Sequence, residues 1–187
     1  MCSSDLTRTH RFVNSFVWDL PHLKKNSMAD KVLGNWRLSA ITSLQSGRPF
    51  SVGASNNPVA SAGSARADLV GVGYPILDVN RSKGEIISRY MDRARFTNPA
   101  NNTYGTLGRN MLFGPGFANV DTSIAKGWRL PFIGESGIIE YRFEAFNLSN
   151  ATHLGNPVTG LTNPNFGKIL RTDGDARILQ MALKVAW

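Results

Sequence analysis

Apolar residues recur at every second position in several segments of this sequence, which is the pattern of β-strands with two different faces. The alternation is unbroken in residues 177–187, at the end of the chain. Four more segments with strand character are bounded by turn-forming residues, namely 10–19, 34–46, 118–130 and 137–148. Helical spacing is found only near residues 84–95. The pattern therefore predicts an all-β chain that forms an antiparallel meander of about five long strands.

The two faces of the predicted strands differ in chemistry. In residues 34–46 the apolar positions are Trp36, Leu38, Ala40 and Leu44, and the polar positions are Arg37, Ser39, Ser43 and Gln45. In residues 137–148, Ile139, Tyr141, Phe143 and Ala145 alternate with Glu140, Arg142 and Glu144. These charges need water or each other, so the polar face is either the solvated face of a soluble sandwich or the lumen of a membrane barrel. In a barrel, we expect Arg142 to lie between the two carboxylates.

Segment lengths favour the barrel. Residues 53–117 are rich in Asn, Gly, Ser, Ala and Pro, and so long a loop is uncommon in a compact domain but typical of the outer side of an outer-membrane barrel. The last strand has about the 9 to 11 residues that a tilted strand needs to cross a bilayer. If Trp187 ends in the periplasm, the short turn 131–136 is periplasmic, and residues 53–117 and 149–176 are external. We therefore expect transmembrane strands in the bacterial outer membrane.

Charge and candidate chemistry narrow the function further. The chain has 21 Lys+Arg and 13 Asp+Glu, a formal net charge of +8, but the basic residues are dispersed and no nucleic-acid-binding motif accompanies them. We expect no nucleic-acid partner, and a cationic surface suits outer-membrane lipid and lipopolysaccharide. Cys2 is the only cysteine, and the histidines at positions 10, 22 and 153 are far apart. No nucleophile has a base at a recognisable spacing, so we expect no enzyme activity, no metal site and no cofactor.

Several motifs are interpreted as backbone chemistry. Asn101, Asn147 and Asn150 begin glycosylation-like triplets, which we interpret as turns because Asn tolerates a left-handed backbone. Gly71 and Gly73 lack the third glycine of a dinucleotide fingerprint. We interpret Gly105, Gly108, Gly114 and Gly116 as residues that shape the backbone. Arg109 is expected to form a salt bridge, an interpretation that we favour over contact with substrate. Asp68, Asp78 and Asp92 lack the close spacing of a calcium-binding loop.

Taken in order, the segments resemble the C-terminal barrel of TonB-dependent outer-membrane transporters, especially Oar-like receptors that carry an N-terminal carboxypeptidase-regulatory-like domain. The residues that carry the likeness are HRFVNSFVWDLP, GNWRLSAITSLQSGRPFSV, GTLGRNMLFGPGFANVDTSIAKGWRL, YRFEAFNLSNATHLGNP, NFGKIL and DARILQMALKVAW. The family's NLFN appears as Asn147-Leu-Ser-Asn150, and Trp187 takes the place of the usual terminal Phe.

Membership would imply a barrel of about 22 strands with an N-terminal plug and energy supplied by the TonB complex. Residues 10–187 would then be the C-terminal part of a longer receptor for a large nutrient, such as an iron chelate or a glycan. Residues 1–9 are expected to be non-native or disordered, because residues 1–6 resemble a translated sequencing adapter. The plug and the other strands would lie in the rest of the protein.

The resemblance also assigns roles to residues. The last strand is similar to the signal read by the outer-membrane assembly machinery, which would be formed by Leu179, Met181, Leu183, Val185 and Trp187. Glu140, Arg142 and Glu144 would face the lumen. The alternatives are a soluble β-sandwich binding module, for example for carbohydrate, and a small autonomous barrel. The second needs at least about eight strands.

Overall fold

The computed structural model describes residues 8–21, 28–54, 65–134 and 137–187. These residues divide into two compact units. The strand unit consists of Arg11–Leu44, Ala118–Thr152 and Asp175–Trp187, and the loop unit consists of Gln45–Phe117, His153–Gly174 and the described part of Met1–His10. Of residues 1–9, which were expected to be non-native or disordered, residues 1–7 lie outside the described part of the chain.

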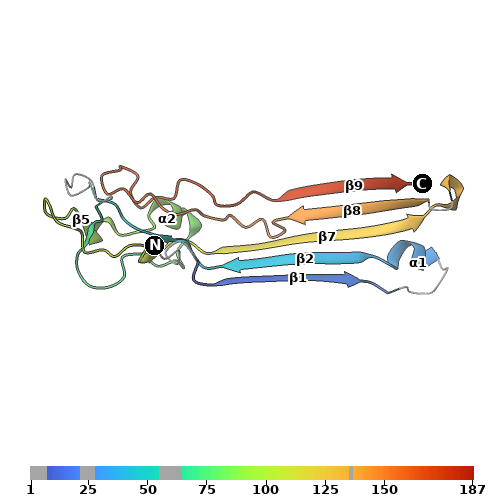
Figure 1. Ribbon diagram of the computed structural model, residues 1–187, viewed down its shortest axis with the longest axis horizontal. Coiled ribbons are helices and arrows are strands. Elements are labelled where there is room, and N and C mark those ends of the chain that lie inside the picture. Colours follow the sequence, from blue (N-terminus) through green and yellow to red (C-terminus); the bar gives the residue numbers. More distant parts are fainter. Residues whose placement is uncertain (1–7, 22–27, 55–64, 135–136) are drawn as a thin grey trace. The chain divides into compact units, whose positions relative to one another are not determined.

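The strand unit is one antiparallel sheet of five strands, arranged in their order along the chain (Figure 1). The strands are β1 (Arg11–Asp19), β2 (Arg37–Gln45), β7 (Phe117–Arg129), β8 (Ile138–Phe146) and β9 (Ile178–Ala186). All five predicted strands are present, with ends that differ from the sequence pattern by a few residues. The predicted all-β meander is therefore confirmed.

The register aligns side chains of one kind across neighbouring strands. Along β8 and β9, Ile139 is paired with Val185, and Tyr141 with Leu183. We call the face that carries these pairs the apolar strand face. Side chains of this face are exposed: Leu183 is 65% exposed and Val185 is 46% exposed. A continuous apolar surface of this kind requires a non-aqueous neighbour or a partner.

A short helix, α1 (Met28–Leu33), lies between β1 and β2, in a segment for which the sequence pattern predicted neither a helix nor a strand. Six residues are too few to show a helical period, and isolated short helices are unstable in water. Here the helix carbonyls accept hydrogen bonds from side chains of the sheet: Trp36 Nε1 donates to Val32 O (2.9 Å) and Trp128 Nε1 to Lys31 O (2.8 Å). No helix among the described residues combines enough length and apolar character to cross a membrane.

The connection between β7 and β8 is a short turn, as predicted. It contains the 3-10 helix η4 (Pro131–Ile133), and Leu130 N donates to Gly137 O (2.8 Å) to close it. Residues 135–136 lie outside the described part of the chain. The end of β9 lies at the same end of the sheet as this turn and α1 (Figure 1).

The loop unit has short elements around a hydrophobic core of its own. Its elements are β3 (Pro49–Phe50), β4 (Asp68–Leu69), α2 (Lys83–Ser88), η3 (Arg93–Arg95), β5 (Phe96–Thr97) and β6 (Leu112–Phe113), with β3 paired to β6 and β4 to β5. Its buried residues are Phe50, Val52, Ala67, Tyr90, Met91, Phe96, Leu107, Leu112, Leu161 and Ile169. The last two come from the connection between β8 and β9. The two long connections therefore fold together.

The predicted helix at residues 84–95 is shorter in the structure. Ser82 and Glu85 form a capping box that begins α2, and Ser82 Oγ donates to Glu85 Oε2 (2.6 Å). The helix ends at Ser88, because Arg89 is extended and the chain turns so that Tyr90 and Met91 enter the core. Tyr90 Oη donates to Phe113 O (3.0 Å), and burial raises the pKa of Tyr90 to about 12. Packing thus ends the helix that the local spacing would extend.

The interpretation of the Asn-containing triplets as turns is confirmed by the backbone. Asn102, Asn147 and Asn150 have φ values of 61°, 52° and 51°. Asn147 is also buried, and its Nδ2 donates to Ala151 O (2.9 Å) and Asp175 O (3.1 Å) while its Oδ1 accepts from Ala151 N (2.9 Å). This one side chain connects the end of β8 to the start of β9.

The exposure of the apolar strand face predicts a difference between substitutions on β9. We expect Leu183→Arg, in the complete barrel protein, to destabilise the folded state by about 2–4 kcal/mol if Leu183 contacts the bilayer interior. Ala182→Arg on the opposite face should be tolerated, because the Cα partner of Ala182, Arg142, lies between two carboxylates. The measurement is the amount of heat-modifiable barrel in outer membranes. Equal losses for the two variants would contradict the assignment of faces.

The position of Asn147 generates a second prediction. Asn147→Gly keeps the left-handed backbone accessible but removes the side-chain hydrogen bonds, so we expect a loss of about 1–3 kcal/mol. Asn147→Ala should lose about 1–2 kcal/mol more, because alanine is strained at this φ. Asn102→Gly is the control, since Asn102 is exposed and has the same backbone conformation. Thermal unfolding of the detergent-solubilised barrel measures the order, and Asn147→Gly at wild-type stability would refute the role of this side chain.

Candidate functional site

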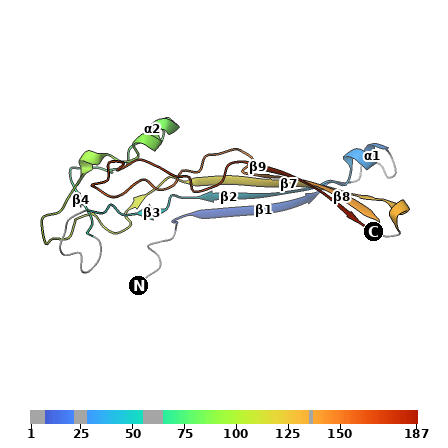
Figure 2. The same ribbon diagram turned by 90° about the horizontal axis from the view of Figure 1, so that it is seen from above.

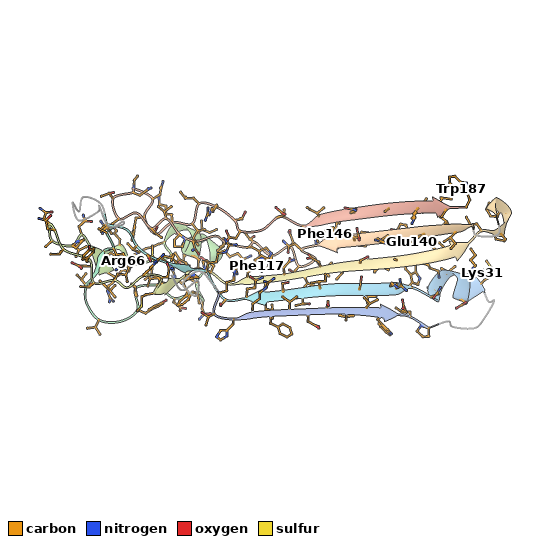
Figure 3. All side chains as sticks on the ribbon, viewed as in Figure 1. Lys31, Arg66, Phe117, Glu140, Phe146 and Trp187 are labelled. Carbon is orange, nitrogen blue, oxygen red and sulfur yellow. The ribbon has the colours of Figure 1, made fainter. Side chains whose placement is uncertain are left out.

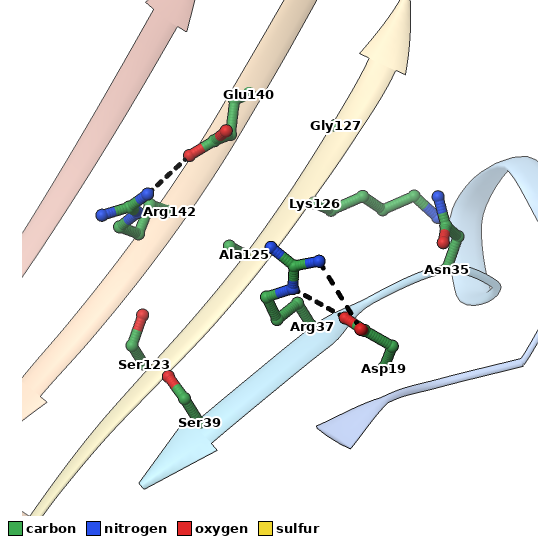
Figure 4. Close-up of a pocket in the computed structure, with 10 residues that line it drawn as sticks. All are labelled: Asp19, Asn35, Arg37, Ser39, Ser123, Ala125, Lys126, Gly127, Glu140 and Arg142. Carbon is green, nitrogen blue, oxygen red and sulfur yellow. Dashed lines mark hydrogen bonds and ion pairs between the residues drawn. The ribbon is translucent and has the colours of Figure 1, made fainter. Parts of the chain in front are cut away.

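The side of the sheet opposite the apolar strand face carries the candidate functional groups, and we call it the polar strand face. The register brings Ala125 opposite Arg142 and Gly127 opposite Glu140. Because β7 contributes only small side chains here, a shallow depression of about 330 Å³ lies between the charged residues of β2 and β8. Its lining residues are Asp19, Asn35, Arg37, Ser39, Ser123, Ala125, Gly127, Glu140 and Arg142 (Figure 4). Lys126, whose place in the register belongs to the apolar strand face, also borders the depression.

Ion pairs hold the charged side chains of the polar strand face in place. Arg142 lies 2.8 Å from Glu140 and 3.9 Å from Glu144, as the spacing on this strand predicted. Arg37 Nε lies 2.7 Å from Asp19 Oδ1. These groups remain accessible to solvent, with side-chain exposures between 22% and 65%. Ion pairs in such a setting contribute only about 0–1 kcal/mol each, so they orient the side chains more than they stabilise the sheet.

The polar strand face is suited to hydrogen bonding. Its hydroxyl, carboxylate and guanidinium groups can bind water or polar ligand groups, and each cation of the two ion-pair sets has a carboxylate beside it. Among the described residues, no group of three His, Cys, Asp or Glu side chains is placed to hold a metal ion. The absence of enzymatic activity stays a prediction.

The loop unit offers a second candidate surface, the loop of residues 70–73, which Arg95 holds in place. The guanidinium of Arg95 donates to the carbonyl oxygens of Val70 (2.7 Å), Val72 (2.7 Å) and Gly73 (2.8 Å). Gly71 and Gly73 adopt φ values of 75° and 98°, which glycine adopts readily. The backbone conformation therefore accounts for glycine at these positions, and no bound nucleotide is needed to explain it. The loop is thereby fixed with Val72 at its surface, 97% exposed.

A cavity of about 430 Å³ lies in the loop unit. Its lining includes an amide, a hydroxyl and a guanidinium beside apolar side chains, so it can accept a ligand with both polar and apolar parts. The lining residues are Phe50, Asn156, Pro157, Val158, Thr159, Leu170 and Arg171. Sequence reasoning did not identify this cavity, because residues near position 50 are joined to residues 156–171 only by the fold.

The three aspartates considered for calcium are each engaged locally. Asp68 Oδ1 accepts from Thr106 N (2.8 Å) and Asp78 Oδ1 from Asn80 N (2.9 Å). Asp92 caps η3 and lies 2.6 Å from Arg89 Nη2. All three therefore serve as hydrogen-bond acceptors that shape the loops.

The glycines given a structural role meet close neighbours. A Cβ on Gly105 would lie 1.9 Å from Arg66 O, and one on Gly114 would lie 2.0 Å from Asn156 Oδ1. The backbone of Arg66 and the amide of Asn156 occupy the space that any larger residue would need. The structural interpretation of these two glycines is therefore confirmed, while the salt bridge expected of Arg109 stays a prediction.

Four of the residues proposed as an assembly signal lie on β9, at one edge of the described sheet, and Trp187 directly follows this strand. Their side chains are all open to the surroundings, with Met181 71% and Trp187 84% exposed. Figure 3 shows Trp187 at the same end of the strand unit as Lys31, while Phe146 marks the opposite end of β8. This placement leaves the strand accessible, and its reading by assembly machinery stays a prediction.

One residue that the sequence reasoning missed is Lys126, a charged residue on the apolar strand face. Its Cα partner on β8 is Tyr141, and it is only 3% exposed. The signal was available, because Ile124, Lys126 and Trp128 occupy alternate positions of one strand. A lysine at an apolar position of a strand indicates that other groups of the protein bind its ammonium.

The comparisons with known proteins agree with this geometry. Residues 2–180 match the family model described as an outer membrane beta barrel domain. No curated protein and no solved structure matches the chain significantly. The match extends over nearly the whole chain, and it explains an exposed apolar face opposite a hydrated polar one. The chain belongs to the outer membrane β-barrel domain family, and its location is the bacterial outer membrane.

Proposed function

We propose that this chain supplies wall strands and two external loops of a TonB-dependent receptor that takes up a large nutrient, such as an iron chelate or a glycan. The resemblance of its ordered segments to that family supports the proposal. The soluble β-sandwich considered from the sequence is wrong, because the family is an outer-membrane barrel. Partners would be lipopolysaccharide, the assembly machinery and the TonB complex.

The observation that carries the proposal is the common core of the two long connections. Leu161 and Ile169, between β8 and β9, pack with Phe50, Met91 and Phe96, which lie between β2 and β7. A barrel that only spans the membrane needs no folded loops, whereas ligand recognition needs loops in a fixed conformation. The loop unit, with its cavity and the loop fixed by Arg95, therefore supports ligand capture.

The edges of the sheet support a larger barrel. Strands β1 and β9 are the two edges of the described sheet. An unpaired strand edge is not tolerated in the hydrocarbon region, because its backbone N–H and C=O groups would lack partners. We propose that both edges pair with further strands of a barrel of about 22 strands. The polar strand face would then meet a plug domain through hydrated polar contacts.

TonB dependence is the direct test of this function. In the source bacterium, deletion of the gene for the complete barrel protein and inactivation of TonB should each abolish growth on the same substrate, within a panel of ferric chelates and glycans supplied as the sole iron or carbon source. Re-expression of the barrel should restore growth only when TonB is present. Uptake of the substrate by the barrel in cells without TonB would refute the proposal.

The end of the chain provides a further test. Deleting Trp187, or adding a polar tail after it, should reduce the inserted barrel severalfold without changing synthesis or export, because the terminal strand would pair with the assembly machinery through its main chain. Trp187→Phe is the matched control and should be tolerated, since both rings suit the membrane interface. Fractionated outer membranes report the outcome. Normal amounts of inserted barrel in a variant without the terminal aromatic residue would refute the interpretation of this strand as an assembly signal.

A further inference from the structure

The helix α1 lies on the apolar strand face. Three residues whose side chains reach its carbonyls are Trp36, Lys126 and Trp128. Lys126 pairs with Tyr141 and Trp128 with Ile139, so both belong to the apolar strand face by register. Figure 2 shows the helix standing to one side of the strand ends. The helix thus covers part of a face that otherwise contacts lipid.

A buried cation attaches the helix to the sheet. Lys126 Nζ donates to Gly34 O and to Asp30 O (3.4 Å), near the C-terminal end of α1. The same ammonium lies 5.4 Å from the ring centroid of Trp36 and 5.5 Å from that of Trp128. Carbonyls at the end of a helix and the faces of aromatic rings both stabilise a cation. These contacts replace the water that the ammonium loses.

The side of α1 away from the sheet is apolar and uncovered. Met28, Val32 and Leu33 are 75%, 59% and 62% exposed. Lys31 is also exposed and provides a positive charge beside them. Such side chains would be unfavourable in water, but they continue the surface formed by Leu183 and Val185, which a membrane barrel presents to lipid.

We propose that α1 is a membrane-interface helix that binds phospholipid at the end of the barrel where the chain terminates. Met28, Val32 and Leu33 enter the boundary between headgroups and acyl chains, and Lys31 contacts the phosphates. Interfacial helices lie about 5–10 Å into this boundary, with lysine extending toward the headgroups. Lys126 positions the helix and has no contact with lipid of its own. The inference rests on the outer-membrane location and does not require TonB-dependent uptake.

The test measures the depth of the helix in a bilayer. The complete barrel protein, with Cys2 replaced by Ser, receives a single spin-labelled cysteine at Val32 and is reconstituted in nanodiscs of phosphatidylethanolamine and phosphatidylglycerol. Collision with oxygen should be favoured over collision with a water-soluble nickel chelate, as at a label on Leu183 but to a smaller extent. A label on Val72 in the loop unit provides the aqueous reference. A Val32 label as accessible to nickel as the Val72 label would overturn the proposal.

A second variant tests the role of Lys126. Lys126→Met keeps a long side chain but removes the charge, so the Val32 label should become more mobile and shift toward the aqueous reference. The Leu183 label and the heat-modifiable band should stay unchanged. Arg129→Met is the matched control, because Arg129 lies on the polar strand face of the same strand, paired with Ile138. If the mobility and accessibility of the Val32 label are unchanged in Lys126→Met, the anchoring role of Lys126 is overturned. If the Val32 label keeps its normal depth but the protein takes up no substrate, the result contradicts the proposed transport function and leaves this inference intact.

Discussion

The strand unit depends on one constraint: each strand must present apolar side chains to lipid on one face and polar side chains to water on the other, while every backbone group is paired. Side chains alternate with a period of two, so a slip of one residue would place Glu140 and Arg142 in lipid. The register of β8 against β9 satisfies the constraint in the middle of the two strands, with Tyr141 opposite Leu183 and Glu144 opposite Gln180. At one end, Phe146 lies opposite Ile178 on the side that carries the charges. The same constraint makes any unpaired strand edge unfavourable.

This constraint explains which elements the sequence predicts. The five strands are visible because lipid on one side imposes a strict alternation over about ten residues, and the ion pairs of Arg142 follow directly from that alternation. Helix α1 was missed because six residues show no helical period and because one of its side-chain donors, Trp128 on β7, is 97 residues away in sequence. The loop core was missed for a similar reason. Its members come singly from short segments, and no local period connects Val52 with Leu161.

The loop unit is fixed by polar side chains that act on backbone groups. Arg95 engages three carbonyls, and Asn147 connects two segments of the strand unit in the same way. Long segments without regular strands leave many backbone groups unpaired, and a buried unpaired group is costly. Arg and Asn meet this need because each presents several donors in a fixed geometry. The composition that resembled an unstructured loop therefore specifies a folded one.

Lys126 shows how depth in the membrane decides whether a charge is tolerated. A lysine facing lipid costs about 2–4 kcal/mol at the middle of a bilayer and about 0–1 kcal/mol near its surface. Lys126 is three residues from the end of β7 and lies between Trp36 and Trp128, indole side chains that favour the interface. The carbonyl oxygens of Asp30 and Gly34, near the end of α1, also accept hydrogen bonds from the Lys126 ammonium. The cation, the two indoles and the helix therefore mark the end of β7 beside α1 as the part of this strand that lies near the membrane surface. Trp187 lies at the same end of the sheet.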